Sequence, residues 1–147
     1  MPNDYVTEND RSRQRMRALI AALTDDDLAR PVNDEWTAAA ALAHVALWDA
    51  RVTFLIRKLR SGAAFTDDDV EPDDVSWIND SARPLLHAIG PRRAAEVALE
   101  IAEETDALVA DTPAEQMYPA DPNGLINAFR SQHRDEHVDE IEAAVRR

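Results

Sequence analysis

Three of the four histidines in this chain are spaced so that they could bind a metal ion. His133 and His137 lie four residues apart near the end of the sequence, and His44 lies inside an earlier apolar run. Four residues make just over one helical turn, so both later imidazoles leave the same face of one helix. A third imidazole from another helix would complete a three-nitrogen site with open coordination positions, which suits a catalytic ion better than a structural zinc.

The two later histidines continue an apolar stripe on the last predicted helix. The residues of that stripe are spaced four apart and are Phe129, His133, His137, Ile141 and Val145. A buried neutral histidine needs hydrogen-bond partners, and two adjacent ones without a purpose would be costly. The alternative interpretation is that the pair arises by chance and that one or both rings lie at the surface among charged neighbours.

His44 is the only strongly polar side chain in the inner part of the apolar run 36–48. A lone histidine on such a helix is more often a hydrogen-bonded core residue than a ligand. The small alanines around it would leave space for an ion and for a molecule bound beside the ion. Taken together with His133 and His137, it favours a divalent-metal site.

Three carboxylates are candidates for catalysis or for orienting the imidazoles. They are Glu136, Glu140 and Asp49. An imidazole ligand normally donates its other N–H group to a carboxylate or a carbonyl, which fixes its tautomer. Residues 133–137 also fit the H-x-x-E-H pattern of inverted zinc proteases, in which Glu136 would be the general base. We reject that interpretation because such proteases are far larger and His44 supplies a better third ligand.

Weaker candidates could line a pocket beside the histidines. Trp48 and Arg51 share a helix face with His44, so Trp48 could wall the pocket and Arg51 could hold an anionic substrate or the carboxylate of a thiol. The alternative is a core tryptophan and an arginine whose stem packs while its head stays in water. Trp77 and Asn79 could close the pocket mouth. The fourth histidine, residue 87, has no histidine at helical spacing and is expected to be structural or exposed.

The composition of the chain limits the classes of protein to which it can belong. At 147 residues it can bury one core as a single domain, and without cysteine it has no disulfide, thiolate zinc site or catalytic cysteine. Its net charge of −13 argues against nucleic acid and anionic membranes as partners. The polar start is not a secretory signal, and no apolar run approaches the roughly 20 residues of a membrane span. We therefore expect a soluble cytoplasmic protein with a small-molecule partner.

The elements that position these residues are predicted to be helices. Ala, Leu, Glu and Arg abound, and no alternating strand pattern persists. A short helix over residues 75–82 is expected to stop before Pro84, which fits poorly in a helix interior. The signals for capping and termination predict long helices over residues 4–23, from an N-cap at Thr37 to Ser61 with Gly62 as the stop, from Gly90-Pro91 onward, and from Asp121-Pro122 to near Arg147.

Four long helices and one short connecting helix predict an all-α fold, a four-helix bundle. The connection over residues 62–90 is long enough to cross the bundle, so a simple up-down-up-down order is not required. On the third long helix the predicted buried stripe is Val97, Ile101 and Leu108, with Ala94 and Ala98 easing the contact.

Several of these residues together resemble the DinB superfamily. The resemblance rests on Trp36-Thr37 at a helix start, on the run Ala43-His44-Val45-Ala46-Leu47-Trp48-Asp49, and on the closing pair His133 and His137 followed by Ile141. It covers essentially the whole chain in helix order and length. This superfamily includes the N-terminal domain of mycothiol-dependent maleylpyruvate isomerase and the bacillithiol transferases. The resemblance implies a four-helix bundle in which His44, His133 and His137 hold a divalent metal ion.

The resemblance says less about the reaction, since many members of the superfamily have no assigned substrate. The chain has no second domain of the kind that maleylpyruvate isomerases carry, so isomerisation is not the expected activity. With no protein cysteine, any thiol must come from solution. We predict a metal-dependent enzyme that activates a low-molecular-weight thiol such as mycothiol, which is an S-transferase activity.

Other functions stay open at this stage. One is a metal-dependent hydrolase that uses bound water, and another is a non-catalytic bundle that binds or sequesters a small molecule. In a third, the histidines are only core residues of an interaction module, and metal neither binds nor stabilises the fold. All-nitrogen coordination suits several ions, of which zinc is our first choice and nickel our second. Bundles of this kind often pair through an apolar helix face, which makes a homodimer a further expectation.

Overall fold

The described part of the chain folds into helices and loops. The computed structural model describes residues 4–146, and this part contains no β-strand, only two isolated bridges. The prediction of an all-α protein is therefore confirmed. The elements, in chain order, are α1 (Asp4–Ala22), α2 (Asp25–Leu28), α3 (Ala38–Arg60), η1 (Asp67–Asp69), α4 (Ser76–His87), α5 (Pro91–Ala110), η2 (Ala114–Gln116) and α6 (Ser131–Val145).

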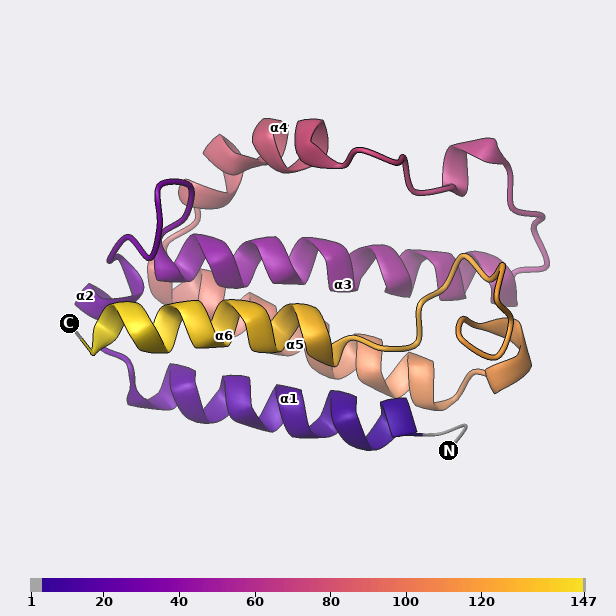
Figure 1. The fold of residues 1–147 in the computed structure, drawn as a ribbon, viewed down its shortest axis with the longest axis horizontal. Coiled ribbons are helices and arrows are strands. Elements are labelled where there is room, and N and C mark those ends of the chain that lie inside the picture. Colours follow the sequence, from indigo (N-terminus) through magenta and orange to yellow (C-terminus); the bar gives the residue numbers. More distant parts are fainter. Residues whose placement is uncertain (1–3, 147) are drawn as a thin grey trace.

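The four long helices lie side by side (Figure 1). Helix α1 contacts α5 and α6, and α3 contacts the same two helices from the other side. Figure 1 also shows that the connection after α3 returns along the outside of that helix through α4 before α5 begins. As a result α3 and α5 run in the same direction, while α1 and α6 run in the opposite one. The site histidines of α3 and α6 thus come from neighbouring helices.

The ends of α3 follow the predicted signals. The hydroxyl of Thr37 accepts a hydrogen bond from the Ala40 amide at 3.1 Å, which satisfies one of the free N–H groups of the first turn. At the other end Gly62 adopts a φ of +80°, which glycine does without the steric cost of a side chain. Pro91 is likewise the first residue of α5, directly after Gly90.

Helix α4 is longer than predicted, because it passes through Pro84 and ends at His87. A proline in a helix removes the hydrogen bond to the carbonyl four residues earlier, here that of Asp80. Both Asp80 and Pro84 are exposed, so water can satisfy this carbonyl. The prediction that the helix stops before Pro84 was wrong for this reason.

The last helix begins at Ser131 rather than at Asp121-Pro122. The carboxylate of Asp121 accepts from the Asn123 amide at 3.0 Å, and the Asp121 carbonyl accepts from the Gly124 amide at 3.0 Å, so this Asp-Pro pair builds a tight turn. A side chain at Gly124 would come within 2.8 Å of the Tyr118 amide nitrogen. The turn therefore packs against the chain that precedes it, and Phe129 belongs to this loop rather than to the helical stripe.

Helix α5 packs against α3, and four of its seven buried residues are alanines. The predicted stripe of Val97, Ile101 and Leu108 is only half-buried, so that prediction was wrong by one helix position. Small side chains let the two backbones approach closely, and the larger apolar side chains then cover the flanks of the contact. The fully buried residues of α5 include Ala94, Ala95, Ala98, Ala102 and Val109.

Helix α3 is long and apolar enough to cross a membrane by length and composition, contrary to the expectation that no segment would be. Within the protein, however, 72% of its apolar window is buried. Such burial is typical of the core helix of a soluble protein.

Candidate metal centre

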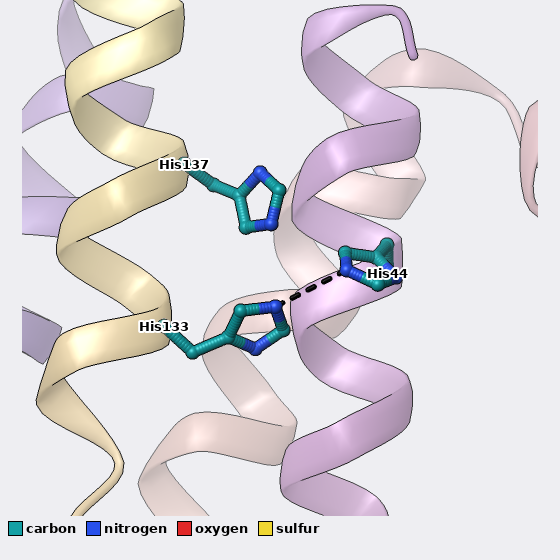
Figure 2. A group of neighbouring side chains, drawn as sticks. All are labelled: His44, His133 and His137. Carbon is teal, nitrogen blue, oxygen red and sulfur yellow. Dashed lines mark hydrogen bonds between the residues drawn. The ribbon is translucent and has the colours of Figure 1, made fainter. Parts of the chain in front are cut away.

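The three predicted ligands meet between α3 and α6 (Figure 2). One potential ligand atom from each of His44, His133 and His137 lies within 4.8 Å of the other two. The Nε2 atoms of His44 and His133 are 3.1 Å apart. Two nitrogens that each lie about 2.0–2.1 Å from a shared ion are about 2.8–3.4 Å apart at tetrahedral or octahedral angles. The spacing of these two nitrogens therefore fits a common ion.

The environment of the cluster keeps the imidazoles neutral. His44 and His137 are buried and His133 is half-buried. Burial, together with His137 and Arg83, lowers the pKa of His44 to about 4, and burial together with the other two imidazoles lowers that of His133 to about 3. Burial also lowers the pKa of His137, although Glu140 and Glu136 oppose the shift. A neutral imidazole is the form that binds a metal, so the three rings need to lose no proton at pH 7.

Two ring nitrogens in the cluster lack a hydrogen-bond partner within residues 4–146. They are the buried Nδ1 atoms of His44 and His137. Glu140 Oε1 lies 3.4 Å from His137 Nδ1, which is an ion-pair distance without hydrogen-bond geometry. A small rotation of the Glu140 side chain would complete the bond, leaving Nε2 of His137 for an ion. With Nε2 as the ligand atom of His44 and of His137, Nδ1 is the nitrogen that a second hydrogen-bond partner would hold.

Aromatic stacking holds the His44 ring from behind. Its ring stacks on Trp36 at 4.8 Å and 25°, and His87 also stacks on that indole, at 5.7 Å and 6°. The Thr37 amide donates to Nε2 of His87 at 3.4 Å, so Nδ1 of the same ring is the donor to the Arg83 carbonyl, 2.9 Å away. His87 is thus exposed and outside the cluster, and it serves the packing of α4 on the start of α3.

The three candidate carboxylates occupy different positions. Glu140 lies beside His137 and accepts a hydrogen bond from Asn33 at 2.7 Å. Glu136 is exposed and lines the cavity beside the histidines. The carboxylate of Asp49 is buried and binds two arginines rather than an imidazole. Of the three, only Glu136 is placed to reach a molecule in the cavity, and only Glu140 is placed to orient a ligand.

A cavity of about 570 Å³ opens beside His44 and His133. Trp48 lies in its wall and donates from Nε1 to Asn79 Oδ1 at 3.0 Å, so α3 and α4 are joined at this wall. Arg51 also lines the cavity and donates to the Asp69 carbonyl at 2.7 Å. Trp77 is 63% exposed and does not line the cavity. Three of the four weaker candidates therefore gather at one pocket.

Sequence reasoning missed a group of buried charges beside the histidines. Arg134 has no exposed surface, although its position among charged residues suggested a solvent-facing side chain. It binds the buried carboxylates Asp49 and Asp106. The sequence did hold one signal, namely Asp49, which is the only carboxylate in helix 38–60 and follows its apolar first half. A buried carboxylate needs a buried cation, and Arg130 and Arg134 supply two.

Comparison with known proteins places a family pattern over most of the chain. The pattern of the DinB superfamily matches residues 8–135, which include His44 and His133. No curated protein and no solved structure matches the chain.

Proposed function

The chain belongs to the DinB superfamily, and we propose that its four long helices form a crossover bundle whose three histidines hold a divalent metal ion for catalysis. The observation that carries this proposal is the convergence of three neutral imidazoles with ligand atoms within 4.8 Å of one another, two of which, those of His44 and His133, line a cavity of about 570 Å³. A histidine cluster that served only packing would need no adjoining cavity. We take zinc as the first candidate ion and nickel as the second.

A divalent ion at this site would lower the pKa of a thiol or a water molecule that it coordinates. The cavity provides space for that molecule on the side of His44 and His133. The chain contains no cysteine, so the proposed nucleophile is a low-molecular-weight thiol from solution, such as mycothiol. The proposed reaction is transfer of this thiol to an electrophilic small molecule.

Glu136 is the proposed base for this reaction. Its carboxylate lines the cavity three positions after His133 on α6, so both side chains lie on the same side of the helix. It would take the proton of the S–H group as sulfur forms its bond to carbon, and would then pass that proton to the departing group, or to the neighbouring carbon where the electrophile is an activated double bond. Trp48 would pack against the bound molecule, while Glu140 holds His137 in orientation.

Hydrolysis is the second candidate for the same site. Glu136 would then take a proton from water, and the rest of the arrangement would be unchanged. A binding protein without catalysis is the third candidate, since the cavity and the ion would also suit sequestration. The exposed carboxylate on the cavity wall favours the enzyme, because a binder has no use for a base beside the histidines.

The first experiment is the metal content of the protein purified without an affinity tag. The variants are His44→Ala and His133→Ala, and His87→Ala is the matched control because it removes a histidine outside the cluster. We expect about one metal ion per chain in the parent and in His87→Ala, with loss in both cluster variants. A parent without metal that zinc and nickel also fail to stabilise against heat would refute the metal site.

The second experiment separates the enzyme from the binder. The metal-loaded protein is incubated with a thiol and an electrophile, and separately with ester and amide substrates. We expect thiol transfer in the parent and a loss of about 10²-fold or more in Glu136→Gln, which is the typical contribution of a general base. Metal-loaded protein without either activity would favour the binder.

A further inference from the structure

Beyond the metal site, we propose that Arg130 is a binding site for the carboxylate group of the small molecule that occupies the cavity. This inference rests on the proposed function only in assuming that the cavity binds the reacting molecule. It depends on the buried charges behind the cavity, which lie apart from the histidine nitrogens. The ion pairs hold these side chains in position, and the arginine at one end of the group lacks a second carboxylate partner.

Arg130 is held rigidly by buried ion pairs. Its Nε donates to Asp49 Oδ1 at 3.0 Å, and the other oxygen of this carboxylate accepts from Nε and Nη2 of Arg134, each at 3.1 Å. Asp49 and Arg134 are almost fully buried, and Arg130 is more than nine-tenths buried. A guanidinium held in this way loses little conformational entropy when it binds a ligand.

The buried group of ion pairs carries more positive than negative charge. Arg134 donates from Nη1 and Nη2 to the two oxygens of Asp106 at 2.9 and 2.8 Å, and Arg13 also donates to Asp106. Three guanidinium groups, on Arg13, Arg130 and Arg134, thus share two buried carboxylates. At one end Arg13 pairs with a further carboxylate, that of Asp10. At the other end Arg130 has no second carboxylate within residues 4–146.

The guanidinium of Arg130, which lacks a second carboxylate partner, lies at the cavity. Arg130 lines the cavity together with His133. Its Nη1 has one long contact, 3.4 Å to the Phe129 carbonyl, and its Nη2 has no partner in the part of the chain that the structure describes. Nη2 is not among the buried atoms without a partner, so solvent can reach it. The edge of the guanidinium that carries Nη1 and Nη2 is therefore available to a ligand.

The geometry of this guanidinium edge determines the class of ligand. Two parallel N–H groups match the two oxygens of a carboxylate in one plane. Arg130 precedes His133 by three positions, about one helical turn, so a small acid could reach both the guanidinium and the histidines. Glu71 and Glu136 also line the cavity, but neither forms an ion pair with Arg130.

Arg51 is the rival cation in the cavity wall. It lies on α3, is half-buried, and its Nη2 is engaged by the Asp69 carbonyl. A backbone carbonyl fixes one N–H group but supplies no second arginine or carboxylate to hold the whole side chain. Arg130 is thus the better preorganised anchor, and the experiment must separate the two.

The test compares benzoate with benzamide, two planar probes of nearly equal size that differ in charge. Both are titrated into the full chain as purified and again after metal removal with a chelator, because a carboxylate can also coordinate an ion. The protein has a net charge of −13, so long-range electrostatics disfavour benzoate. We expect benzoate to bind on the order of ten-fold more tightly than benzamide in the metal-free protein, as charge-assisted hydrogen bonds would give.

The variants are Arg130→Gln, Arg51→Gln and Arg57→Gln, an exposed control outside the cavity wall. We expect the preference for benzoate to disappear in Arg130→Gln and to persist in the other two. If Arg130→Gln does not fold, Arg130→Lys replaces it and should reduce the preference. In that case benzoate, but not benzamide, should also shift the Arg130 Nε–H resonance of the parent protein, assigned by its absence in the lysine variant.

Equal binding of the two probes to the parent would overturn the inference, as would a preference that survives loss of Arg130 or depends on Arg51. The proposed function can fail separately. A protein that binds no metal, yet prefers benzoate through Arg130, would refute the metalloenzyme and leave the carboxylate site in place. A protein that binds metal but shows no preference for benzoate in its metal-free form would refute the carboxylate site and leave the proposed metal site in place.

Discussion

The lowered pKa values of the histidines predict that metal affinity changes little between pH 7.5 and 5.5. Metal binding normally competes with protonation of the ligands, so affinity falls as the pH drops below the imidazole pKa. In this cluster burial lowers the pKa of His44 to about 4 and that of His133 to about 3. Both rings should therefore remain neutral and available at pH 5.5.

The difference from an ordinary three-histidine site is large. An imidazole with the usual pKa of about 6.5 is neutral in roughly one molecule in eleven at pH 5.5, and three such ligands would weaken binding about 10³-fold relative to pH 7.5. Here only His137 could titrate in this range, and burial lowers its pKa as well. The expected loss of affinity is therefore about ten-fold at most.

Isothermal titration with Ni²⁺ measures both the affinity and the protons released. Nickel is preferred for this assay because ionisation of zinc-bound water near pH 7 would release additional protons. At pH 6.5, titrations in buffers of different ionisation enthalpy should give less than about half a proton per ion bound, against about one and a half for three ordinary imidazoles.

The control for this titration is His87→Gln, which removes an exposed histidine outside the cluster and should leave both quantities unchanged. A loss of affinity near 10³-fold, with about one and a half protons released, would show that the imidazoles titrate as in water. It would refute the reasoning from burial.

Three further predictions concern the stability of the fold and of the site. Arg134→Met should lower the free energy of unfolding by about 3–5 kcal/mol in urea titrations, because it leaves two buried carboxylates without this partner, whereas Arg17→Met at the surface should change it by less than about 0.5 kcal/mol. Glu140→Gln should weaken metal binding about ten-fold in a competition assay, and Glu136→Gln should not. The metal-free protein should lose stability in thermal melts as the pH falls from 6.5 to about 4, because unfolded His44 binds a proton that the folded form resists; full stability at pH 4 would contradict this.

The helices and the candidate ligands could be predicted because their causes are local. The N-cap at Thr37 and the positive φ of Gly62 are satisfied within a few residues, so they can be recognised from the sequence alone. The spacing of His133 and His137 fixes their common helix face wherever that helix lies. His44 needed a further argument, since its place opposite the pair depends on how α3 packs against α6.

The start of the last helix could not be predicted, because two local signals compete there. Asp121-Pro122 can open a helix or a tight turn, and the close contact of Gly124 with the Tyr118 backbone accompanies the turn. Pro84 presents the opposite case, in which an unfavourable residue is tolerated at an exposed position, where water can satisfy the carbonyl that it leaves free. In both places the outcome depends on contacts outside the local pattern.

The buried ion pairs connect the local helix signals to the packing of the helices. Asp49 lies five positions after His44 on α3, and Arg134 directly follows His133 on α6, so their ion pair fixes the register of the two helices that carry the ligands. A helix shifted by one residue turns its side chains by about 100° and would separate the imidazoles. Purely apolar packing by alanines would tolerate such a shift more readily than an arginine bound to two carboxylates. If the ion pair has this role, Arg134→Met should weaken metal binding even under conditions in which the variant remains folded, whereas a merely destabilised bundle would bind the ion with unchanged affinity.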